Sequence, residues 1–168
     1  MKKMNNKGFS LVELIIVIAI MAILAGAIAP ALIRYIDKSR KSNDVSSGKT
    51  IKTAVETAMG NEVAYEELTN NGSGSTIEVT PSGTTSAAVT CSAATQDTKD
   101  EIFNNIGEKT PKIKYKKNDA AKFVVTVTSK GTVKVWLAKS TYTLPSNDCD
   151  THGTGCWELA PDLDKEYQ

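Results

Sequence analysis

The distribution of hydrophobic and polar residues separates an apolar segment near the N-terminus from a remainder of mixed polarity. No charged residue occurs from Leu14 to Ile33, and Glu13 stands immediately before this run. About 20 residues at a rise of about 1.5 Å each span roughly 30 Å, the thickness of the hydrocarbon core of a bilayer. The pattern therefore predicts a membrane-spanning helix with a single acid at its edge.

Two residues of this segment carry specific expectations. A carboxylate beside a membrane span costs a few kcal/mol unless it finds a partner, so we interpret Glu13 as a functional residue. Near the far end of the run, Gly26 and Pro30 interrupt the helical pattern. Because proline lacks a backbone donor and clashes with the preceding turn, we expect the helix to bend or loosen at Pro30.

Beyond the span, the pattern predicts that the helix continues over 34–67 as an amphipathic element. An apolar stripe repeats every four residues, at Ile51, Val55, Met59 and Val63. This stripe is expected to pack on a head domain. The Asn and Gly residues of 69–75 then mark the end of the helix.

The clearest strand pattern covers Lys122 to Ala138. Apolar and polar residues alternate on both sides of a reversal at Ser129–Gly131, so this segment predicts a β-hairpin. Outer strands are expected at Lys112–Lys116 and Ser140–Leu144. The connecting region contributes shorter elements, which are strands at Thr76–Thr80 and Ala87–Thr90 and a helix at Thr95–Ile106.

These elements predict an α+β fold. A small antiparallel sheet is expected to lay its apolar face on the amphipathic half of a long N-terminal helix. Trp136 falls on the sheet face opposite Val135, where it either covers the sheet or belongs to a subunit contact.

The N-terminus carries a recognisable motif that consists of Lys7, Gly8, Phe9, Ser10, Leu11, Val12 and Glu13, followed by the apolar run. It resembles the class III signal of type IV pilins and pseudopilins. The resemblance implies that a prepilin peptidase cleaves after Gly8 and that the new amino terminus, Phe9, is methylated. Glu13 then becomes the fifth residue of the mature chain and Pro30 the twenty-second, the positions at which the family shows its acid and its helix-breaking proline.

The resemblance also implies an organisation and a fold. A prepilin leader at 1–8 precedes a hydrophobic transmembrane and assembly helix at 9–33 and an amphipathic helix of the head at 34–67. The αβ-loop, the antiparallel sheet and a C-terminal cysteine region follow at 68–168. This is the type IV pilin fold.

The implied function is that of a structural pilus subunit, polymerised through its N-terminal helix for adhesion, motility or DNA uptake. The Glu13 carboxylate of one subunit pairs with the Phe9 amine of its neighbour, which sets each incoming subunit in register. The implied partners are further copies of the chain in a helical filament, the prepilin peptidase, and an inner-membrane assembly platform with its ATPase. The membrane holds the precursor, the filament is extracellular, and a host surface or DNA is a further candidate ligand.

Other interpretations of the same N-terminus remain open. A minor pilin, or a pseudopilin of type II secretion or competence, shares the motif. An ordinary signal peptide is favoured by the basic start and by Ala25, Gly26 and Ala27, which fit an A-x-A cleavage site. A plain single-pass anchor, carrying a surface enzyme or binding protein, is a further alternative.

Three cysteines, Cys91, Cys149 and Cys156, follow the span. Cys149 and Cys156 bracket a short polar segment that can close into a disulfide loop, which resembles the C-terminal disulfide loop of many pilins, although any pairing of the three is open. Alternatively, Cys91, Cys149, His152 and Cys156 form a tetrahedral zinc site. Calcium is a further alternative at a set of acids, Asp148, Asp150, Asp162 and Asp164. The leading expectation is a protein without cofactors.

Charge and motif content narrow the function classes. The net charge is +1, and removal of Lys2, Lys3 and Lys7 leaves 17 basic against 19 acidic residues, a net charge of −2. Such a chain lacks a strong nucleic-acid footprint, although its basic clusters at 34–41 and 112–117 can contact lipid headgroups, surface polymers or DNA. With one histidine and no recognisable nucleophile–base spacing or phosphate loop, the sequence predicts no enzyme.

Overall fold

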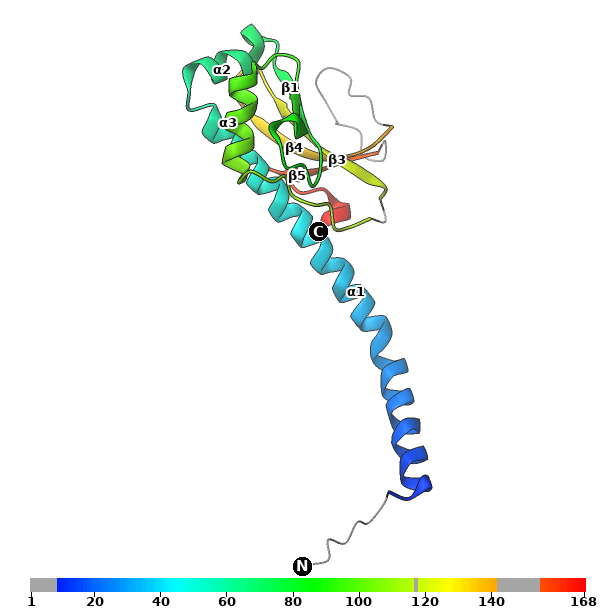
Figure 1. The fold of residues 1–168 in the computed structure, drawn as a ribbon. Helices are drawn as coiled ribbons and strands as arrows, with labels where there is room; N and C mark the ends of the chain where they lie inside the picture. Colours follow the sequence, from blue (N-terminus) through cyan, green and yellow to red (C-terminus); the bar gives the residue numbers. More distant parts are fainter. Residues whose placement is uncertain (1–8, 117, 142–154) are drawn as a thin grey trace, which may run out of the picture. The chain divides into compact units, whose positions relative to one another are not determined.

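The computed structural model describes residues 9–116, 118–141 and 155–168 (Figure 1). The chain divides into two compact units, Met1–Lys38 and Ser39–Gln168. The second unit is called the head below. One helix, α1 (Leu11–Ala58), supplies residues to both units.

Helix α1 is continuous over its 48 residues, and Pro30 lies inside it. The predicted loosening at Pro30 is therefore not seen in the backbone. The residues around Pro30 are mainly alanine, leucine and isoleucine, most of which have favourable helix propensities, so the loss of one backbone hydrogen bond does not end the helix.

The helix predicted to run to Glu67 is interrupted, and this part of the prediction was wrong. Helix α1 ends at Ala58, and a separate helix, α2 (Glu62–Thr69), begins after a turn. Asn61 caps α2, because its side-chain oxygen accepts a hydrogen bond from the Val63 N–H at 3.0 Å. The interruption turns the chain, so Val63 is 61% exposed.

Five strands form one antiparallel sheet in the order β2-β1-β3-β4-β5. The predicted hairpin is confirmed as β3 (Ala120–Val127) and β4 (Val133–Lys139), with Val125 opposite Val135. Strand β1 (Ser75–Val79) pairs with β3, and the short β2 (Val89–Cys91) lies at its outer edge. Strand β5 (Cys156–Ala160), which the sequence pattern did not predict, forms the other edge beside β4.

The remaining elements are short. Helix α3 (Gln96–Ile106) confirms the helix predicted there. Three 3₁₀ turns complete the described chain: η1 (Asn70–Gly72), η2 (Ser86–Ala88) and η3 (Lys165–Tyr167). The break predicted at 69–75 is confirmed, since α2 ends at Thr69 and β1 begins at Ser75.

The outer strand predicted at Lys112–Lys116 does not form, because its backbone donors have another partner. The Asp44 carboxylate of α1 accepts hydrogen bonds from the N–H groups of Lys114 at 2.7 Å and Tyr115 at 2.8 Å. The segment is extended, as its alternation indicated, but a buried side chain takes the place of a neighbouring strand. Of the other predicted outer strand, 142–144 lies outside the described residues, and Ser140 follows the end of β4.

The main core of the head lies between the sheet and the helices. From α1, Ile51, Ala54, Val55 and Ala58 are buried against alternate residues of the central strands, Phe123, Val125, Val135 and Leu137. Helix α3 adds Ile102 and Phe103 to the same cluster. The expected packing of the sheet on the amphipathic half of α1 is confirmed.

Trp136 covers the opposite face of the sheet. It is 4% exposed and packs with Val124, Ala138 and Cys156 in a second buried cluster. Its indole N–H donates to the Thr126 hydroxyl at 3.2 Å. Of the two expected roles for Trp136, the structure shows the covering one.

Glu67 of α2 holds the start of α3. Its Oε2 accepts hydrogen bonds from the Thr95 N–H at 2.9 Å, the Thr95 hydroxyl at 3.1 Å and the Thr98 hydroxyl at 2.7 Å. The hydrogen bond from the Thr95 N–H is the largest of the effects that hold the pKa of the Glu67 carboxyl below its usual value. A carboxylate from one helix thus satisfies donors at the N-terminus of another.

The first prediction concerns Asp44, which is fully buried. Changing Asp44 to Ala leaves the Lys114 and Tyr115 N–H groups without their acceptor, so the free energy of unfolding of the head should fall by about 2 to 4 kcal/mol. Chemical denaturation in detergent, followed by tryptophan fluorescence, measures this, because both tryptophans lie in the head. The exposed Asp162, changed to Ala, is the matched control and should shift stability little. Equal stability of the two variants would contradict the anchoring role.

The second prediction concerns the pH dependence that Glu67 contributes. A lowered pKa in the folded state means that this contribution is present above the unfolded pKa and is lost as pH falls through the folded pKa. Glu67→Gln should therefore cost about 1 kcal/mol at neutral pH, a value reduced by its partial exposure. The difference from the parent should shrink toward pH 3 in the same denaturation assay. A difference independent of pH would show that the charge is not involved.

Candidate assembly site and cysteine region

The Glu13 side chain caps the N-terminus of α1. Glu13 Oε2 accepts a hydrogen bond from the Ser10 N–H at 2.9 Å, and the Leu14 N–H donates to the Ser10 carbonyl at 3.2 Å. Ser10 and Glu13 have the spacing of a capping box, in which a glutamate at the third helical position satisfies the cap residue's N–H. Glu13 therefore has a local structural partner within one copy of the chain, next to Phe9.

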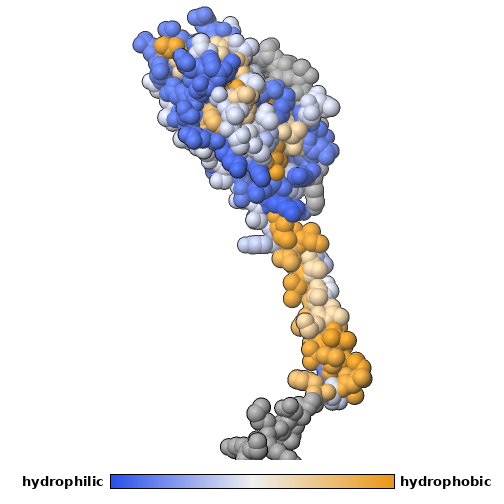
Figure 2. Space-filling view, viewed as in Figure 1, coloured by the Kyte–Doolittle hydropathy of each residue, from blue (hydrophilic) through white to orange (hydrophobic). Residues whose placement is uncertain are grey.

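Within the first compact unit, the described apolar residues of α1 are exposed to solvent. Every residue from Phe9 to Tyr35 is exposed, and Leu14, Ile18, Ile23 and Leu32 are each more than half exposed. Figure 2 shows a nearly continuous hydrophobic surface along this part of the helix. Helix α1 is long and apolar enough to cross a membrane by length and composition. Burial of this surface in lipid, or against other helices, removes it from water.

The predicted processing site lies at the start of the described chain. Phe9 is 86% exposed and precedes the helix, whereas Gly8 lies outside the described residues. Cleavage of the bond before Phe9 creates a positively charged amine four residues from Glu13. The chemistry available at this end is therefore the pairing of an ammonium with a carboxylate at the edge of an apolar helix, where low dielectric strengthens the attraction.

The structure separates the cysteines that the zinc hypothesis combined. Cys91 is a buried free thiol on β2, and Cys156 is disulfide-bonded on β5. These strands are the two edges of the sheet, about 19 Å apart at a strand spacing of about 4.8 Å. Zinc holds each thiolate at about 2.3 Å, so this separation is incompatible with one tetrahedral centre that includes both. Cys149 and His152 lie outside the described residues, and the pairing of Cys149 with Cys156 stays a prediction.

Only two of the four residues of the calcium hypothesis are among the described residues. Asp162 and Asp164 follow β5, whereas Asp148 and Asp150 lie outside the described residues. Within 9–116, 118–141 and 155–168, no three His, Cys, Asp or Glu side chains gather as metal ligands would.

Two grooves on the head are lined in part by lysine, serine, threonine and asparagine residues. One, of about 450 Å³, follows the polar side of α1 and reaches α3, with a lining that includes Lys49, Thr50, Thr53 and Asn105. The other, of about 310 Å³, lies beside the extended segment that Asp44 anchors.

Sequence reasoning missed two charged residues that organise the head, Asp44 and Glu67. Burial raises the pKa of the Asp44 carboxyl, and the hydrogen bonds from the Lys114 and Tyr115 N–H groups act in the opposite direction. Each acid meets its donors some 28 to 71 positions away in the chain. The sequence did offer one indication for Glu67, because Thr95 stands at the start of a predicted helix, whose N–H groups need an acceptor. It offers no indication of the role of Asp44.

One comparison with known families matches the N-terminus of the chain. The family model for the prokaryotic N-terminal methylation motif matches residues 3–29, a range that includes Gly8, Phe9 and Glu13. No solved structure matches the chain.

Curated proteins with similar sequences are fimbrial proteins and pilins. The type IV major fimbrial protein FimA of Dichelobacter nodosus is 42% identical over 57 residues, which are 34% of this chain and 36% of the relative. Fimbrial protein Q of Moraxella bovis is 49% identical over 54 residues, 32% and 34% of the two chains. The type IV major pilin protein PilA of Myxococcus xanthus is 34% identical over 66 residues, 39% and 30% of the two chains.

The matched segments span about a third of the length of these relatives. The methylation motif at residues 3–29 and the partial similarity to curated fimbrial proteins and pilins show that the chain resembles type IV pilins.

Proposed function

We propose that the chain is a structural subunit of a type IV pilus, cleaved after Gly8, methylated on Phe9 and polymerised through α1. The observation that supports it is the uncovered apolar surface of α1 with Glu13 at its start. A helix with this surface is stable in a bilayer or among other helices of the same kind. The methylation motif favours a chain whose helix moves from the bilayer into a bundle of such helices.

Assembly uses the two charges at the start of α1 for register. In the mature chain, the Phe9 ammonium of one subunit pairs with the Glu13 carboxylate of its neighbour, which offsets the desolvation of both charges among apolar helices. The attraction fixes the axial position of an incoming subunit, and apolar contacts between helices hold it, at roughly 25 cal/mol per Å² of apolar area removed from water.

The proposal includes a place in the cell. The precursor lies in the membrane through α1, a prepilin peptidase removes the leader, and a membrane platform with an ATPase extracts the subunit into an extracellular filament. Two of the relatives are major subunits by name, so we assign this chain the role of the main subunit rather than that of a minor pilin or pseudopilin. Attachment and surface motility are the uses that such a filament supports.

The processing step predicts a defined amino terminus. The main protein of filaments sheared from the cells should begin at Phe9 and carry one methyl group on its amine. Mass spectrometry of the intact protein and of its N-terminal peptide measures both properties. An amino terminus beyond Ala27 would instead indicate removal of an ordinary signal peptide, and absence of the chain from the bulk of the filament would assign it a minor role.

The pairing step predicts different roles for the charge and for the cap of Glu13. Changing Glu13 to Ala should leave cleavage after Gly8 largely intact and reduce filament yield about tenfold or more, since a buried ammonium loses its partner. Glu13→Gln keeps an oxygen that accepts from the Ser10 N–H but removes the charge, and it should fail equally. Immunoblots of processed chain and of sheared filaments measure the two steps. Normal filaments from Glu13→Gln would show that Glu13 acts only as a helix cap and that its charge is not needed for assembly.

A further inference from the structure

The segment that Asp44 anchors presents a row of lysines to solvent. Residues 109–116 contain four lysines and no acid. The lysines are exposed, and they alternate from Lys112 onward with the half-buried Ile113 and the buried Tyr115. The backbone of this lysine segment is fixed by the two hydrogen bonds to Asp44, so its charges are held outward by the fold.

Three of these lysines line one of the two grooves on the head. The groove of about 310 Å³ is lined by Lys109, Lys112 and Lys114, with Asn43 and Ser47 from α1 on its other side. Its lining contains no carboxylate. Among residues 9–116, 118–141 and 155–168, no side chain forms a hydrogen bond or ion pair with these three ammonium groups. In the described part of the chain these three ammonium groups thus have no contacting counter-charge, and the charge of Lys114 acts on the buried Asp44 carboxylate without an ion pair.

Helices α2 and α3 present the opposite charge. Helix α2 carries three acids and no base, and α3 carries Asp97, Asp100 and Glu101 against Lys99. Within the described part of the chain, Glu62, Glu66, Asp97 and Glu101 form no hydrogen bond or ion pair with their side chains. These four acids are called the acidic face below.

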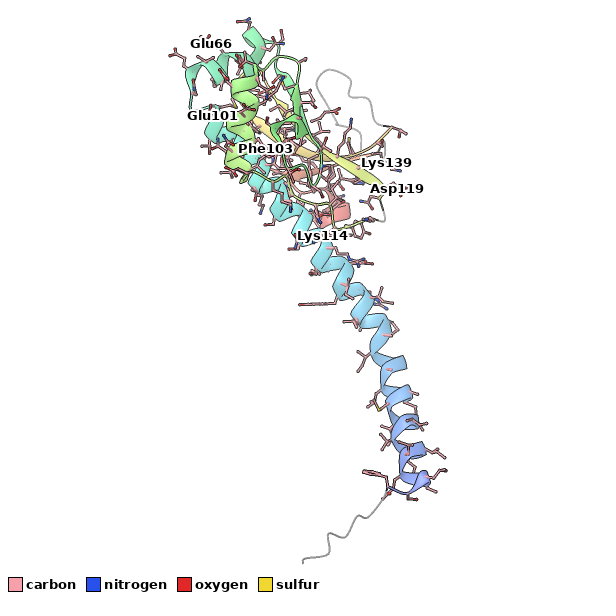
Figure 3. The ribbon with its side chains drawn as sticks, viewed as in Figure 1. Glu66, Glu101, Phe103, Lys114, Asp119 and Lys139 are labelled. Atoms are coloured by element: carbon pink, nitrogen blue, oxygen red, sulfur yellow. The ribbon has the colours of Figure 1, made fainter. Side chains whose placement is uncertain are left out.

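The two charged surfaces cannot meet within one head. Figure 3 shows Glu66 and Lys114 at opposite ends of the head, with Glu101 on the same side as Glu66. Among the described residues, the lysine segment and the acidic face therefore do not neutralise each other within one head. In a polymer of identical copies, the acidic face of the next copy repeats at a fixed position.

We infer that the lysine segment of one head docks on the acidic face of a neighbouring head in the filament. This inference rests on the proposed function, because polymerisation through α1 is what sets two heads side by side. The contact is heterologous: one surface of a copy meets a different surface of the next, and each copy keeps one free surface for further addition. Such contacts generate open helical assemblies when the rotation between copies does not close.

Charge balance favours a second copy over other anionic occupants. A phosphate polymer or an anionic lipid surface would satisfy the lysine segment but would leave the acidic face without a partner. The lysine segment carries four lysines and the acidic face four acids, so the charges of the two surfaces compensate each other. Individual exposed pairs contribute little, and salt weakens them, but several pairs act together at each contact and also select its orientation.

Charge reversal with rescue tests the contact in the full chain. Lys112→Glu with Lys114→Glu should reduce the yield of sheared filaments about tenfold at physiological salt, and Glu66→Lys with Glu101→Lys should do the same. The four substitutions together restore opposite charges across the contact and should return the yield to near the parent level. Lys130→Glu with Lys165→Glu is the matched control, because it makes the same change in net charge at exposed lysines outside the lysine segment, and it should leave the yield unchanged.

Cross-linking gives a readout that does not depend on yield. Filaments assembled from a mixture of Lys112→Cys and Glu66→Cys chains should form disulfide-linked dimers on oxidation, and neither variant alone should do so. Cys91 is a buried thiol common to both variants, so it does not contribute to the difference.

The outcomes separate this inference from the proposed function. Parent-level filaments from the Lys112 and Lys114 double variant, with no dimers from the cysteine mixture, would overturn the head contact while leaving assembly through α1 intact. Loss of filaments without rescue by the fourfold variant would also overturn it, and would indicate an anionic partner other than a second copy. Failure of the parent chain to polymerise would instead refute the proposed function itself.

Discussion

The uncovered apolar surface of α1 is the constraint on which the rest of this molecule depends. The apolar side chains between Phe9 and Tyr35 are exposed to solvent in the described part of the chain, which is unfavourable in water. Lipid and a bundle of apolar helices both remove such a surface from water, so hydrophobicity alone does not distinguish between them. In the proposed assembly, the charge of Glu13 at the edge of the apolar segment makes that distinction.

In the head, two kinds of interaction hold a small sheet against one amphipathic helix. Apolar packing from Ile51 to Ala58 provides the contact area. Two carboxylates then fix segments that no strand pairing reaches: Asp44 holds the 109–116 segment, and Glu67 holds the start of α3. Each uses a charged oxygen to satisfy backbone donors that would otherwise be left without a partner. The polar network thus determines which charges the head presents to its surroundings.

The sequence predicted the elements that depend on local pattern. The β3–β4 hairpin, the α3 helix and the packing of the sheet on α1 follow from alternation and helical periodicity, and all three are present. The break at Gly60 and Asn61 was missed because the apolar spacing continues across it to Val63. The segment at Lys112–Lys116 was predicted as a strand because its alternation is real; only the partner, a distant aspartate, differs. Long-range side-chain anchors of this kind leave no periodic signal.

For the candidate site, too, the contiguous features were predictable from the sequence and those that depend on the fold were not. The motif around Gly8, Phe9 and Glu13 is contiguous, so it was recognisable from the sequence alone, and a family model matches the range that contains it. The zinc hypothesis, in contrast, combined Cys91 with Cys156 by residue type, whereas the order of the strands places these two residues at opposite edges of the sheet. Sheet order is a property of the whole chain, so spacing along the sequence cannot reveal it. The separation of the 109–116 lysines from the acids of α2 likewise follows only from the fold, whereas the N-terminal motif and the apolar segment consist of consecutive residues.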